Sequence, residues 1–443
     1  MADPLITGVA DETVESIMKE DGEANHKAVD EFDVVIVGAG HAGATLANAL
    51  VRKKFTGSVL LVSDEIFQPY HRPPLSKEYL NTDNIKSRPL LTGGVLSSPN
   101  VTFMPGCRIS AGDLQEGTVT LTNGAELGFK KLVLATGASP RKLTIEGADL
   151  EGILSLKTLV DAEKIRDSLL QTKDLVLVGG GFINLELACS LAGAGRNITV
   201  LEQTPRLLQR AVSPVMSEFL KTQAEKLGVR ILLNEEVSRF EGDDNRISHV
   251  LTAAGERFKA GLAVVAIGSV PDPKLAQDLG LESSNGIIVN GQLQAATNVY
   301  AVGDCAFFPD PTTGHSLRLE SVQNATDQAS YVAEELVGSG QEVYHGVSWF
   351  WSVQGDNRLQ IAGLAKPGSK LVVSGNPADG NFAVYHYLDK LLCAVETINR
   401  PGEHMLARKM LKDNFSPTEA QVTQGVDEIK AALASWEANT TTL

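Results

Sequence analysis

Residues 33–53 read DVVIVGAGHAGATLANALVRK and carry the strongest fold signal of the chain. The apolar opening is typical of a strand buried on both faces of a parallel sheet. Gly38, Gly40 and Gly43 follow in the spacing G-x-G-x-x-G, and a helical pattern begins directly after them. Strand, glycine turn and helix in this order predict a dinucleotide-binding unit, in which backbone amides at the helix N-terminus receive a pyrophosphate.

A second strand and an acidic residue complete this unit. The segment SVLLVSDE, residues 58–65, is again apolar, and Asp64 follows its strand roughly 20 residues after the third glycine. A carboxylate at this point is expected to accept hydrogen bonds from the ribose hydroxyls of the nucleotide. A glycine fingerprint alone is a weak signal, but strand, turn, helix, strand and acid together favour nucleotide binding.

The same pattern returns in residues 174–195, DLVLVGGGFINLELACSLAGAG. Gly179 and Gly181 occupy the first two glycine positions, Asn184 stands at the third, and the next strand, ITVLEQ, reaches Glu202. Because the third glycine only sets the distance between helix and strand, we expect a nucleotide site of altered affinity. A glycine-rich loop without a ligand is the alternative for this turn.

Two such units predict two dinucleotides, one a tightly held redox cofactor and the other an exchangeable nicotinamide nucleotide. Three further apolar strands end in glycine-containing segments, Ala135-Thr136-Gly137, Ile267-Gly268 and Gly303-Asp304. At the first two, the chain is expected to leave and re-enter a nucleotide domain. Asp304 beside its glycine can reach a cofactor hydroxyl, although an Asp after a strand is more often a helix cap.

Composition restricts the remaining possibilities. A length of 443 residues favours several domains, and hydrophobic and charged fractions of 43% and 21% are typical of folded proteins without membrane spans. The net charge of −15 argues against nucleic acid and anionic membranes as partners. Residues 1–30 lack the basic and apolar regions of a secretory signal, so we expect a flexible acidic extension and a cytoplasmic protein.

The cysteines limit the redox chemistry. Cys107, Cys189, Cys305 and Cys393 lie far apart, which excludes a local C-x-x-C pair and a zinc knuckle. We expect buried structural thiols in a reducing cytosol and no metal site. A flavin disulphide reductase is disfavoured, since it needs a cysteine pair beside the flavin.

Further motifs give the chain a specific family resemblance. In order they are VVIVGAGHAG, PYHRPPLSK, LVLATGASPR, LVGGGFI, VVAIGSVPD, YAVGDCA, RLESVQNATDQA, WFWS and NRPGEHMLARK. Over residues 32 to about 412 the chain resembles the FAD-dependent NADH:ferredoxin reductases of the putidaredoxin and rhodocoxin reductase type. This group serves Rieske-type dioxygenases and cytochrome P450 systems and is related to apoptosis-inducing factor.

The resemblance implies a FAD site drawn from many parts of the chain. Lys77 resembles the family's flavin-site lysine, whose positive charge stabilises a reduced flavin; a solvated surface lysine is the alternative. Lys157 stands where the family commonly has an arginine. The implied FAD residues are Gly38, Gly40, Ala42, Gly43, Asp64, Arg72, Lys77, Ile109, Ala135, Thr136, Gly137, Lys157, Asp304, Val322 and Trp351.

The choice between NADH and NADPH is expected to depend on Glu202, the acid at the end of the second strand of this unit. Glu202 would accept hydrogen bonds from both ribose hydroxyls and repel a 2′-phosphate, which favours NADH over NADPH. Arg206 and Arg210 weaken this inference, or else contact the pyrophosphate. The resemblance places Glu186 and Glu320 near the nicotinamide, although an acid on a helix is more often solvated. The implied NADH residues are Gly179, Gly181, Phe182, Ile183, Asn184, Glu186, Glu202, Arg210, Ile267, Gly268 and Glu320.

The resemblance also implies the reaction. NADH gives a hydride to FAD, and electrons leave singly to a two-iron two-sulfur ferredoxin that feeds a Rieske-type oxygenase or cytochrome P450, as in aromatic hydrocarbon catabolism. The implied catalytic residues are Lys77, Glu320 and Trp351, and packing in a core strand is the alternative for Trp351, as for Trp349. A docking patch for an acidic ferredoxin would contain Arg318, Arg400, Arg408 and Lys409.

The predicted fold class is α/β, with two Rossmann-like dinucleotide-binding domains of the glutathione-reductase-like flavoprotein type and a C-terminal mixed α/β domain. The expected segments are the extension 1–30, a FAD domain at 31–148 and 275–338, an NADH domain at 149–274, and a domain covering the flavin at 339–443. We expect a monomer or homodimer. Two alternatives remain: an NADH oxidase or monodehydroascorbate reductase-like enzyme, and a non-catalytic binding protein like apoptosis-inducing factor.

Overall fold

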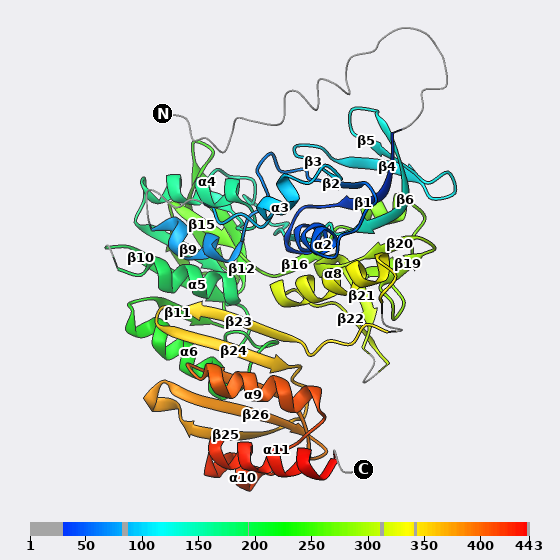
Figure 1. Ribbon diagram of the computed structural model, residues 1–443. Coiled ribbons are helices and arrows are strands. Elements are labelled where there is room, and N and C mark those ends of the chain that lie inside the picture. The colour runs from blue at the N-terminus through cyan, green and yellow to red at the C-terminus, as the bar shows by residue number, and fades with distance from the viewer. Residues whose placement is uncertain (1–29, 82–86, 194, 311–313, 341–342, 441–443) are drawn as a thin grey trace. The chain divides into compact units, whose positions relative to one another are not determined.

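The computed structural model describes residues 30–81, 87–193, 195–310, 314–340 and 343–440 (Figure 1). The expected N-terminal extension lies outside these residues except for its last position. The described chain forms two compact units. The first draws on the ranges Met1–His71, Lys86–Ser139 and Val270–Gly346, and the second on Arg72–Ile85, Pro140–Ser269 and Val347–Leu443.

The first unit is built on a central sheet in the order β19-β20-β6-β1-β2-β3. Strand β1 (Asp30–Val37) runs parallel to both neighbours, β2 (Val59–Val62) and β6 (Glu126–Leu134). Apart from the partly buried Phe32, their apolar residues are almost completely buried, as expected for strands covered on both faces. The carboxyl ends of these parallel strands share one edge of the sheet, and the first glycine turn lies there.

Helices and smaller strands complete the first unit. Helix α2 (His41–Arg52) follows the turn and packs against α8 (Val322–Leu336). The other elements are α3 (Gly93–Leu96), β3 (Val101–Met104), β4 (Ile109–Asp113), β5 (Thr118–Leu121), α7 (Lys274–Asp278), β17 (Ser283–Ser284), β18 (Gly286–Ile288), β19 (Gln294–Ala296), β20 (Val299–Ala301), β21 (Ala306–Pro309) and β22 (Ser316–Leu317).

The second unit contains another parallel sheet, in the order β11-β10-β9-β15-β8. Strand β9 (Asp174–Val178) leads into the second glycine turn and α5 (Phe182–Leu191), and β10 (Asn197–Glu202) lies beside it. The other elements of this region are β8 (Ile153–Leu154), α4 (Leu159–Leu169), α6 (Pro214–Lys226), β11 (Arg230–Leu233), β12 (Val237–Asp243), β13 (Arg246–Thr252), β14 (Arg257–Lys259) and β15 (Leu262–Val265). Short strands β7 (Ala138–Pro140) and β16 (Ser269–Pro271) span the boundaries of the two units.

An antiparallel sheet of the order β23-β24-β27-β26-β25 lies in the C-terminal part of the second unit. Residues of its last helices, such as Met410, Val422 and Ile429, share one hydrophobic core with Tyr385 and Val395 of the sheet. The elements are β23 (Trp349–Gln354), β24 (Asn357–Gly363), β25 (Lys370–Asn376), β26 (Asn381–Leu388), β27 (Leu391–Ile398), α9 (Pro401–Lys412), α10 (Glu419–Gln424) and α11 (Val426–Thr440).

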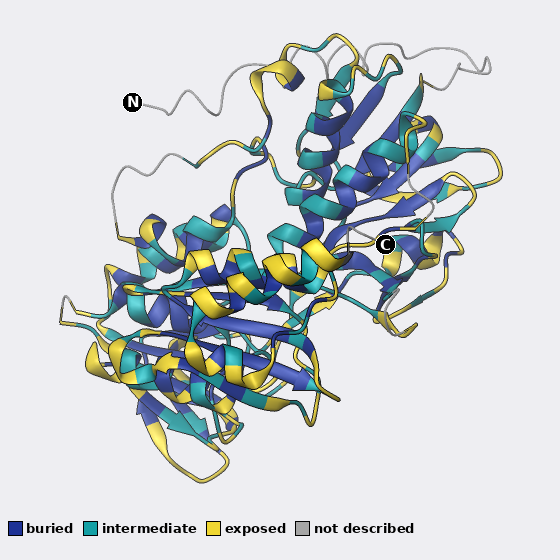
Figure 2. Ribbon diagram, turned by 60° about the horizontal axis from the view of Figure 1, so that its bottom comes forward, coloured by how far each residue is buried: buried dark blue, intermediate teal, exposed yellow. Residues whose placement is uncertain are grey.

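Figure 2 shows the sheet strands as mostly buried, while the helices that cover them keep an exposed outer side. The predicted fold class is confirmed, because each expected strand, glycine turn and helix occurs at the expected residues. The C-terminal stretch DEIKAALASW, residues 427–436, lies in helix α11.

Candidate nucleotide-binding turns and active-site residues

The first glycine turn is closed by backbone atoms. Gly38 has a φ of +102°, a left-handed conformation that favours glycine, and a Cβ added there would overlap the carbonyl of Ala135. A Cβ at Gly43 would overlap the carbonyl oxygen of Gly38, so helix and turn touch directly. A Cβ at Gly40, in contrast, would meet no atom within 4 Å. The turn is therefore tight at its base and open at the helix N-terminus.

Two other predicted FAD segments lie at this turn. Ala135 follows β6 and contacts Gly38 as described, and a Cβ at Gly303 would lie 3.1 Å from the Cβ of Ala42. Gly303 has a φ of +79° and begins the short turn that carries Asp304. The structure therefore brings the segments 135–137 and 303–304 to the start of α2, as their positions at the ends of neighbouring parallel strands require.

The remaining predicted residues of the first unit lie in different surroundings. Asp64 is exposed after β2, whereas the adjacent Glu65 accepts a hydrogen bond of 2.5 Å from the hydroxyl of Tyr70. The side chain of Ile109 is buried, which leaves its backbone as the expected contact. Val322 is the first residue of α8, directly after the capping Ser321. Glu320 is 41% exposed and forms a 2.6 Å ion pair with Arg318.

The second turn has the same backbone but a different closure. Gly179 has a φ of +103°, and an added Cβ would lie 2.5 Å from the carbonyl oxygen of Ala266. Asn184, at the third glycine position, is fully buried, and its Nδ2 donates to the carbonyls of Val178 (2.9 Å) and Gly179 (2.8 Å). The side-chain amide of Asn184 thus forms hydrogen bonds to the turn, whereas a glycine at this position would only pack close to it. Near Gly181, an added Cβ would meet only the oxygen of Ala266, at 3.8 Å.

The carboxylate of Glu202, the expected ribose ligand, is hydrogen-bonded to the glycine turn and to the residues that follow its own strand. Its Oε2 accepts from the amide of Gly180 at 2.6 Å, and its Oε1 accepts from the amide and hydroxyl of Thr204, both at 2.7 Å. A carboxylate accepts about four hydrogen bonds. The negative charge of Glu202 is therefore fixed at the end of β10, with acceptor capacity left for a ligand hydroxyl.

The two arginines after Glu202 differ in their contacts. The guanidinium of Arg206 donates to the carbonyls of Val212 (2.7 Å) and Gln209 (2.6 Å), so it holds its own loop together. Arg210 is exposed, and its Nη2 lies 3.7 Å from a Cβ added at Gly268. The structure thus brings Arg210 to the Ile267-Gly268 segment, while Arg206 serves the loop.

Lys77 and Glu186, predicted separately, form one buried cluster. The Nζ of Lys77 lies 2.5 Å from Oε2 of Glu186, and the side chains are 18% and 10% exposed. Ser76 donates to the same oxygen at 2.5 Å, and Ser352 donates to Oε1 at 2.7 Å. A buried carboxylate is tolerated here because it is paired and hydrogen-bonded. Neither serine was predicted from the sequence. The only signal for Ser76 was its position next to Lys77, and Ser352 had none.

Other predicted residues of the second unit also meet partners. Arg72 donates to the carbonyl oxygen of Lys157 at 3.0 Å. Phe182, the first residue of α5, has its ring 4.5 Å from that of Phe350, and the next residue, Ile183, is 41% exposed. Contacts within the unit thus fix Arg72, Lys157 and Phe182, while Ile183 stays accessible.

The tryptophans lie together on the C-terminal sheet. The ring centroids of Trp351 and Trp349 are 5.4 Å apart, and the guanidinium of Arg408 lies 4.5 Å above Trp349. Burial, and then the charges of Arg408 and Arg358, lower the pKa of the adjacent His404 to about 4. His404 is therefore neutral at pH 7, and the positive charge of this group belongs to the arginines.

The docking patch expected from the sequence is wrong in part. The side chain of Arg318 is 8% exposed and paired with Glu320, so it is not a surface cation. Arg400 is bound within its own domain, where it donates to Glu403 and Asn381. Lys409 is half-exposed, although it pairs with Asp413 and Glu437. A sequence shows the charge of an arginine but not the carboxylate that folding places beside it.

The cysteines have the properties of structural thiols. Each of the four is free of disulphide bonds, and all lie in the described residues. Burial, and then the charge of Glu186, raise the pKa of Cys189 to about 11, and burial raises the pKa of Cys305 and Cys107. These groups stay protonated at neutral pH, which does not suit thiolate chemistry. Among the described residues, no cluster of His, Cys, Asp or Glu could hold a metal ion.

The residues of both turns fit a phosphate-bearing cofactor. Each turn leaves open space at the glycine before a helix, Gly40 and Gly181, where backbone amides are available to an anion. Two such turns in one chain, each after a parallel strand, define an oxidoreductase that uses two dinucleotides.

The chain belongs to the pyridine nucleotide-disulphide oxidoreductase family, which it matches over residues 32–329, and residues 349–433 match the family described as reductase C-terminal. It is therefore an oxidoreductase that uses FAD and a nicotinamide nucleotide. It is 38% identical to rhodocoxin reductase of Rhodococcus erythropolis, over 91% of this chain and 95% of that protein. It is 34% identical to putidaredoxin reductase of Pseudomonas putida, over 86% and 92%.

Solved structures give the same result. The ferredoxin reductase for the CYP199A2 system from Rhodopseudomonas palustris matches with a TM-score of 0.86 and 34% identity, over 89% of this chain and 97% of that one. Putidaredoxin reductase in its covalent complex with putidaredoxin matches with a TM-score of 0.85 and 32% identity, over 92% and 100%. The resemblance inferred from the sequence is confirmed. No helix of the described residues is both long enough and apolar enough to cross a membrane.

Proposed function

We propose that this protein is a FAD-dependent NADH:ferredoxin reductase, which takes a hydride from NADH and passes electrons singly to a two-iron two-sulfur ferredoxin. The observation that carries the proposal is the pair of open glycine turns in one chain, each at the end of a parallel strand. Relatives named rhodocoxin reductase and putidaredoxin reductase support the acceptor class. The ferredoxin would feed a Rieske-type oxygenase or a cytochrome P450, for example in aromatic hydrocarbon catabolism.

Glu202 gives the proposed site its preference for NADH. Because its carboxylate is fixed by Gly180 and Thr204, it cannot swing away from a 2′-phosphate without breaking these hydrogen bonds. Of the two cations expected to offset this repulsion, Arg206 is bound to the carbonyls of its own loop, and the exposed Arg210 lies beside Gly268. The fixed negative charge therefore favours the ribose hydroxyls of NADH.

FAD, when bound, supplies hydride acceptance and single-electron release. In this proposal Lys77 provides the positive charge for the flavin, and Glu186 accepts a hydrogen bond from the nicotinamide carboxamide. The ion pair and the serines hold both side chains in defined positions, so little reorganisation is needed during hydride transfer. The proposal also places Glu320 near the nicotinamide and Trp351 at the edge of the flavin that faces the acceptor.

The proposal includes the domain organisation expected from the sequence. Residues 31–148 and 275–338 would bind FAD, residues 149–274 would bind NADH, and residues 339–443 would form the domain that covers the flavin. The protein would act in the cytoplasm as a monomer or homodimer, without nucleic acid or membrane partners. Arg408 and Lys409 remain as proposed contacts for the ferredoxin.

An acceptor assay tests this function. Purified protein loaded with FAD is given NADH and cytochrome c, with and without a two-iron two-sulfur ferredoxin such as putidaredoxin. We expect fast cytochrome c reduction only when the ferredoxin is present, and faster turnover with NADH than with NADPH. Equal rates without ferredoxin would indicate an oxidase or another acceptor, and an NADPH preference would refute the proposed role of Glu202. Absence of NADH oxidation in all arms would favour a binding protein.

A further inference from the structure

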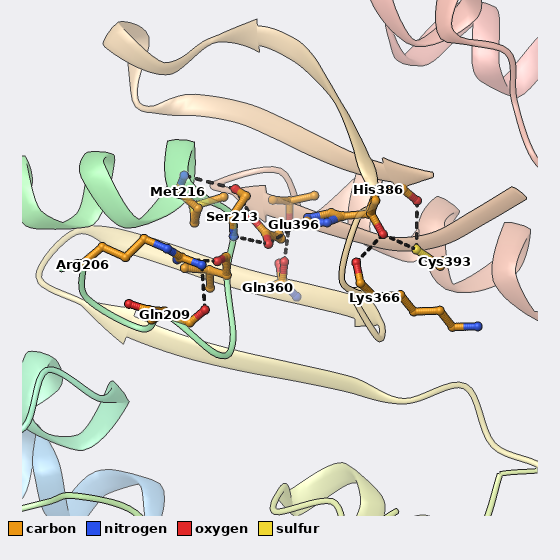
Figure 3. Close-up of polar contacts among 12 residues, drawn as sticks. Arg206, Gln209, Ser213, Met216, Gln360, Lys366, His386, Cys393 and Glu396 are labelled. Atoms are coloured by element: carbon orange, nitrogen blue, oxygen red, sulfur yellow. Dashed lines mark hydrogen bonds and ion pairs between the residues drawn. The ribbon is translucent and has the colours of Figure 1, made fainter. Parts of the chain in front are cut away.

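A carboxylate far along the chain is hydrogen-bonded to the end of the loop that follows Glu202, the proposed ribose ligand. Glu396 of β27 is completely buried, and its Oε2 accepts from the hydroxyl of Ser213 at 2.6 Å (Figure 3). Its Oε1 accepts from the amide of Ser213 at 2.7 Å and lies 2.9 Å from Nε2 of His386. A buried carboxylate is costly unless its oxygens are hydrogen-bonded, and here the loop before α6 supplies two of the donors.

Ser213 connects this carboxylate to a helix and a loop. It is the N-cap of α6, where its Oγ also accepts from the amide of Met216 at 3.2 Å. It ends the segment 203–213, which begins directly after Glu202. The hydroxyl therefore donates to Glu396 while it caps the helix, and both interactions fix the end of the loop.

The other end of the same loop is bound to the glycine turn. Leu208 donates its amide to the carbonyl oxygen of Gly180 at 3.1 Å, and Thr204 donates twice to Glu202. Arg206 donates to the carbonyls of Val212 and Gln209 within the loop (Figure 3). The backbone of this short loop thus connects the hydrogen bonds of Glu396 at one end with those of Glu202, the proposed ribose ligand, at the other, and all of these residues belong to one unit.

We infer that Glu396 and Ser213 are positioning residues for NADH: together they hold the 203–213 loop against the glycine turn and so set the position of the Glu202 carboxylate. The inference rests on the proposed function of the second turn as the NADH site. It gives Glu396, a residue of the C-terminal domain, a role in nucleotide affinity, although neither Glu396 nor Ser213 is proposed to touch the nucleotide. A purely structural role, in which Ser213 only caps α6, predicts lower stability with unchanged affinity.

Ser213→Ala and Glu396→Gln separate these possibilities in the FAD-loaded protein. The first removes the hydroxyl, and the second replaces one of the two acceptor oxygens by an NH₂ group, so that only one of the two hydrogen bonds from Ser213 can be accepted. Anaerobic stopped-flow reduction with NADH gives the dissociation constant and the limiting rate of flavin reduction, and calorimetry with NAD⁺ gives affinity without turnover. We expect both variants to weaken binding roughly tenfold, equivalent to about 1.4 kcal/mol. The limiting rate should stay within about twofold, and Ser213→Thr should restore affinity, because the hydroxyl is retained.

Thr418→Ala is the matched control. Thr418 caps α10 in the same unit, and its side chain accepts from the amide of Gln421, outside the 203–213 loop. Its loss should lower the melting temperature without changing NADH binding. If Ser213→Ala and Glu396→Gln behave like Thr418→Ala, the inference is overturned. Glu202→Ala separates failure of this inference from failure of the proposed NADH site. If it leaves NADH affinity unchanged, the proposed site itself is wrong.

Discussion

The two glycine turns have nearly the same backbone and are closed in different ways. Gly38 and Gly179 have φ values of +102° and +103°, and each lies against the carbonyl of an alanine at the end of a neighbouring strand. In the first turn Gly43 touches the backbone directly, whereas in the second the buried amide of Asn184 donates to it. The third glycine is therefore required where helix and turn are in contact, and replaceable where a donor bridges them.

The largest effect should come from Gly43→Ala. The added methyl would overlap the carbonyl oxygen of Gly38, and backbone cannot rotate away as a side chain can. We expect the free energy of unfolding to fall by well above the roughly 1–3 kcal/mol of ordinary overpacking, and we expect the variant to retain little FAD. The measurement is the flavin absorbance per polypeptide together with the melting temperature.

Gly40→Ala is the control for this change. It has the same chemistry but no atom within 4 Å of the new Cβ, and its φ of −70° suits alanine. It should fold normally, with any effect limited to FAD affinity. Equal instability of the two variants would show that Gly43 is not the point of contact.

Asn184→Asp should have the next largest effect, because it replaces a donor by an acceptor of the same shape. A carboxylate would face the carbonyls of Val178 and Gly179 without a proton to share, at a cost on the order of 3–5 kcal/mol for an uncompensated buried charge. The penalty raises the folded-state pKa of the new carboxyl above its unfolded value of about 3.9. Stability relative to the native protein should therefore recover as the pH falls through that raised pKa. Urea unfolding at several pH values measures this, and a pH-independent difference would contradict it.

Glu202→Gln should weaken NADH binding without affecting FAD binding. The amide keeps one acceptor oxygen, but its NH₂ would oppose either the Gly180 amide or the donors of Thr204. We expect the ratio of NADH to NADPH specificity constants to fall roughly tenfold, or about 1.4 kcal/mol. Glu236→Gln removes an exposed charge next to Glu235, whose amide donates to the carbonyl oxygen of Glu202 at 2.9 Å, and should leave this ratio unchanged. A similar fall in both variants would indicate a general charge effect rather than a fixed ligand.

The same contrast explains what the sequence could predict. Strand, turn and helix were predictable in both units because hydrophobic period and glycine spacing are local signals. Lys77 and Glu186 were each identified, but their ion pair joins residues 109 positions apart and has no local pattern. Ser352 and Glu396 gave no signal at all, since a serine or glutamate on a strand becomes informative only when folding buries it beside a partner. The burial of Arg318 could not be foreseen for the same reason.

Asn184→Gly should produce the smallest effect, because its gains and losses nearly cancel. Glycine loses the donor to the Gly179 carbonyl, worth about 0.5–1.5 kcal/mol, while Val178 keeps the amide of Ala266. Glycine inside α5 costs about a further 1 kcal/mol in helix propensity. Against this, the change removes the buried Oδ1 of Asn184, which meets no donor among the described residues, and so relieves about 1–3 kcal/mol of desolvation. We therefore expect stability within about 1 kcal/mol of the native protein and full FAD content, with a changed Michaelis constant for NADH because the turn is released. Asn184→Ala keeps the Cβ and loses the same donor, so comparing it with the native protein isolates the effect of the amide. If both variants bind NADH as the native protein does, the hydrogen bonds of Asn184 contribute to packing alone.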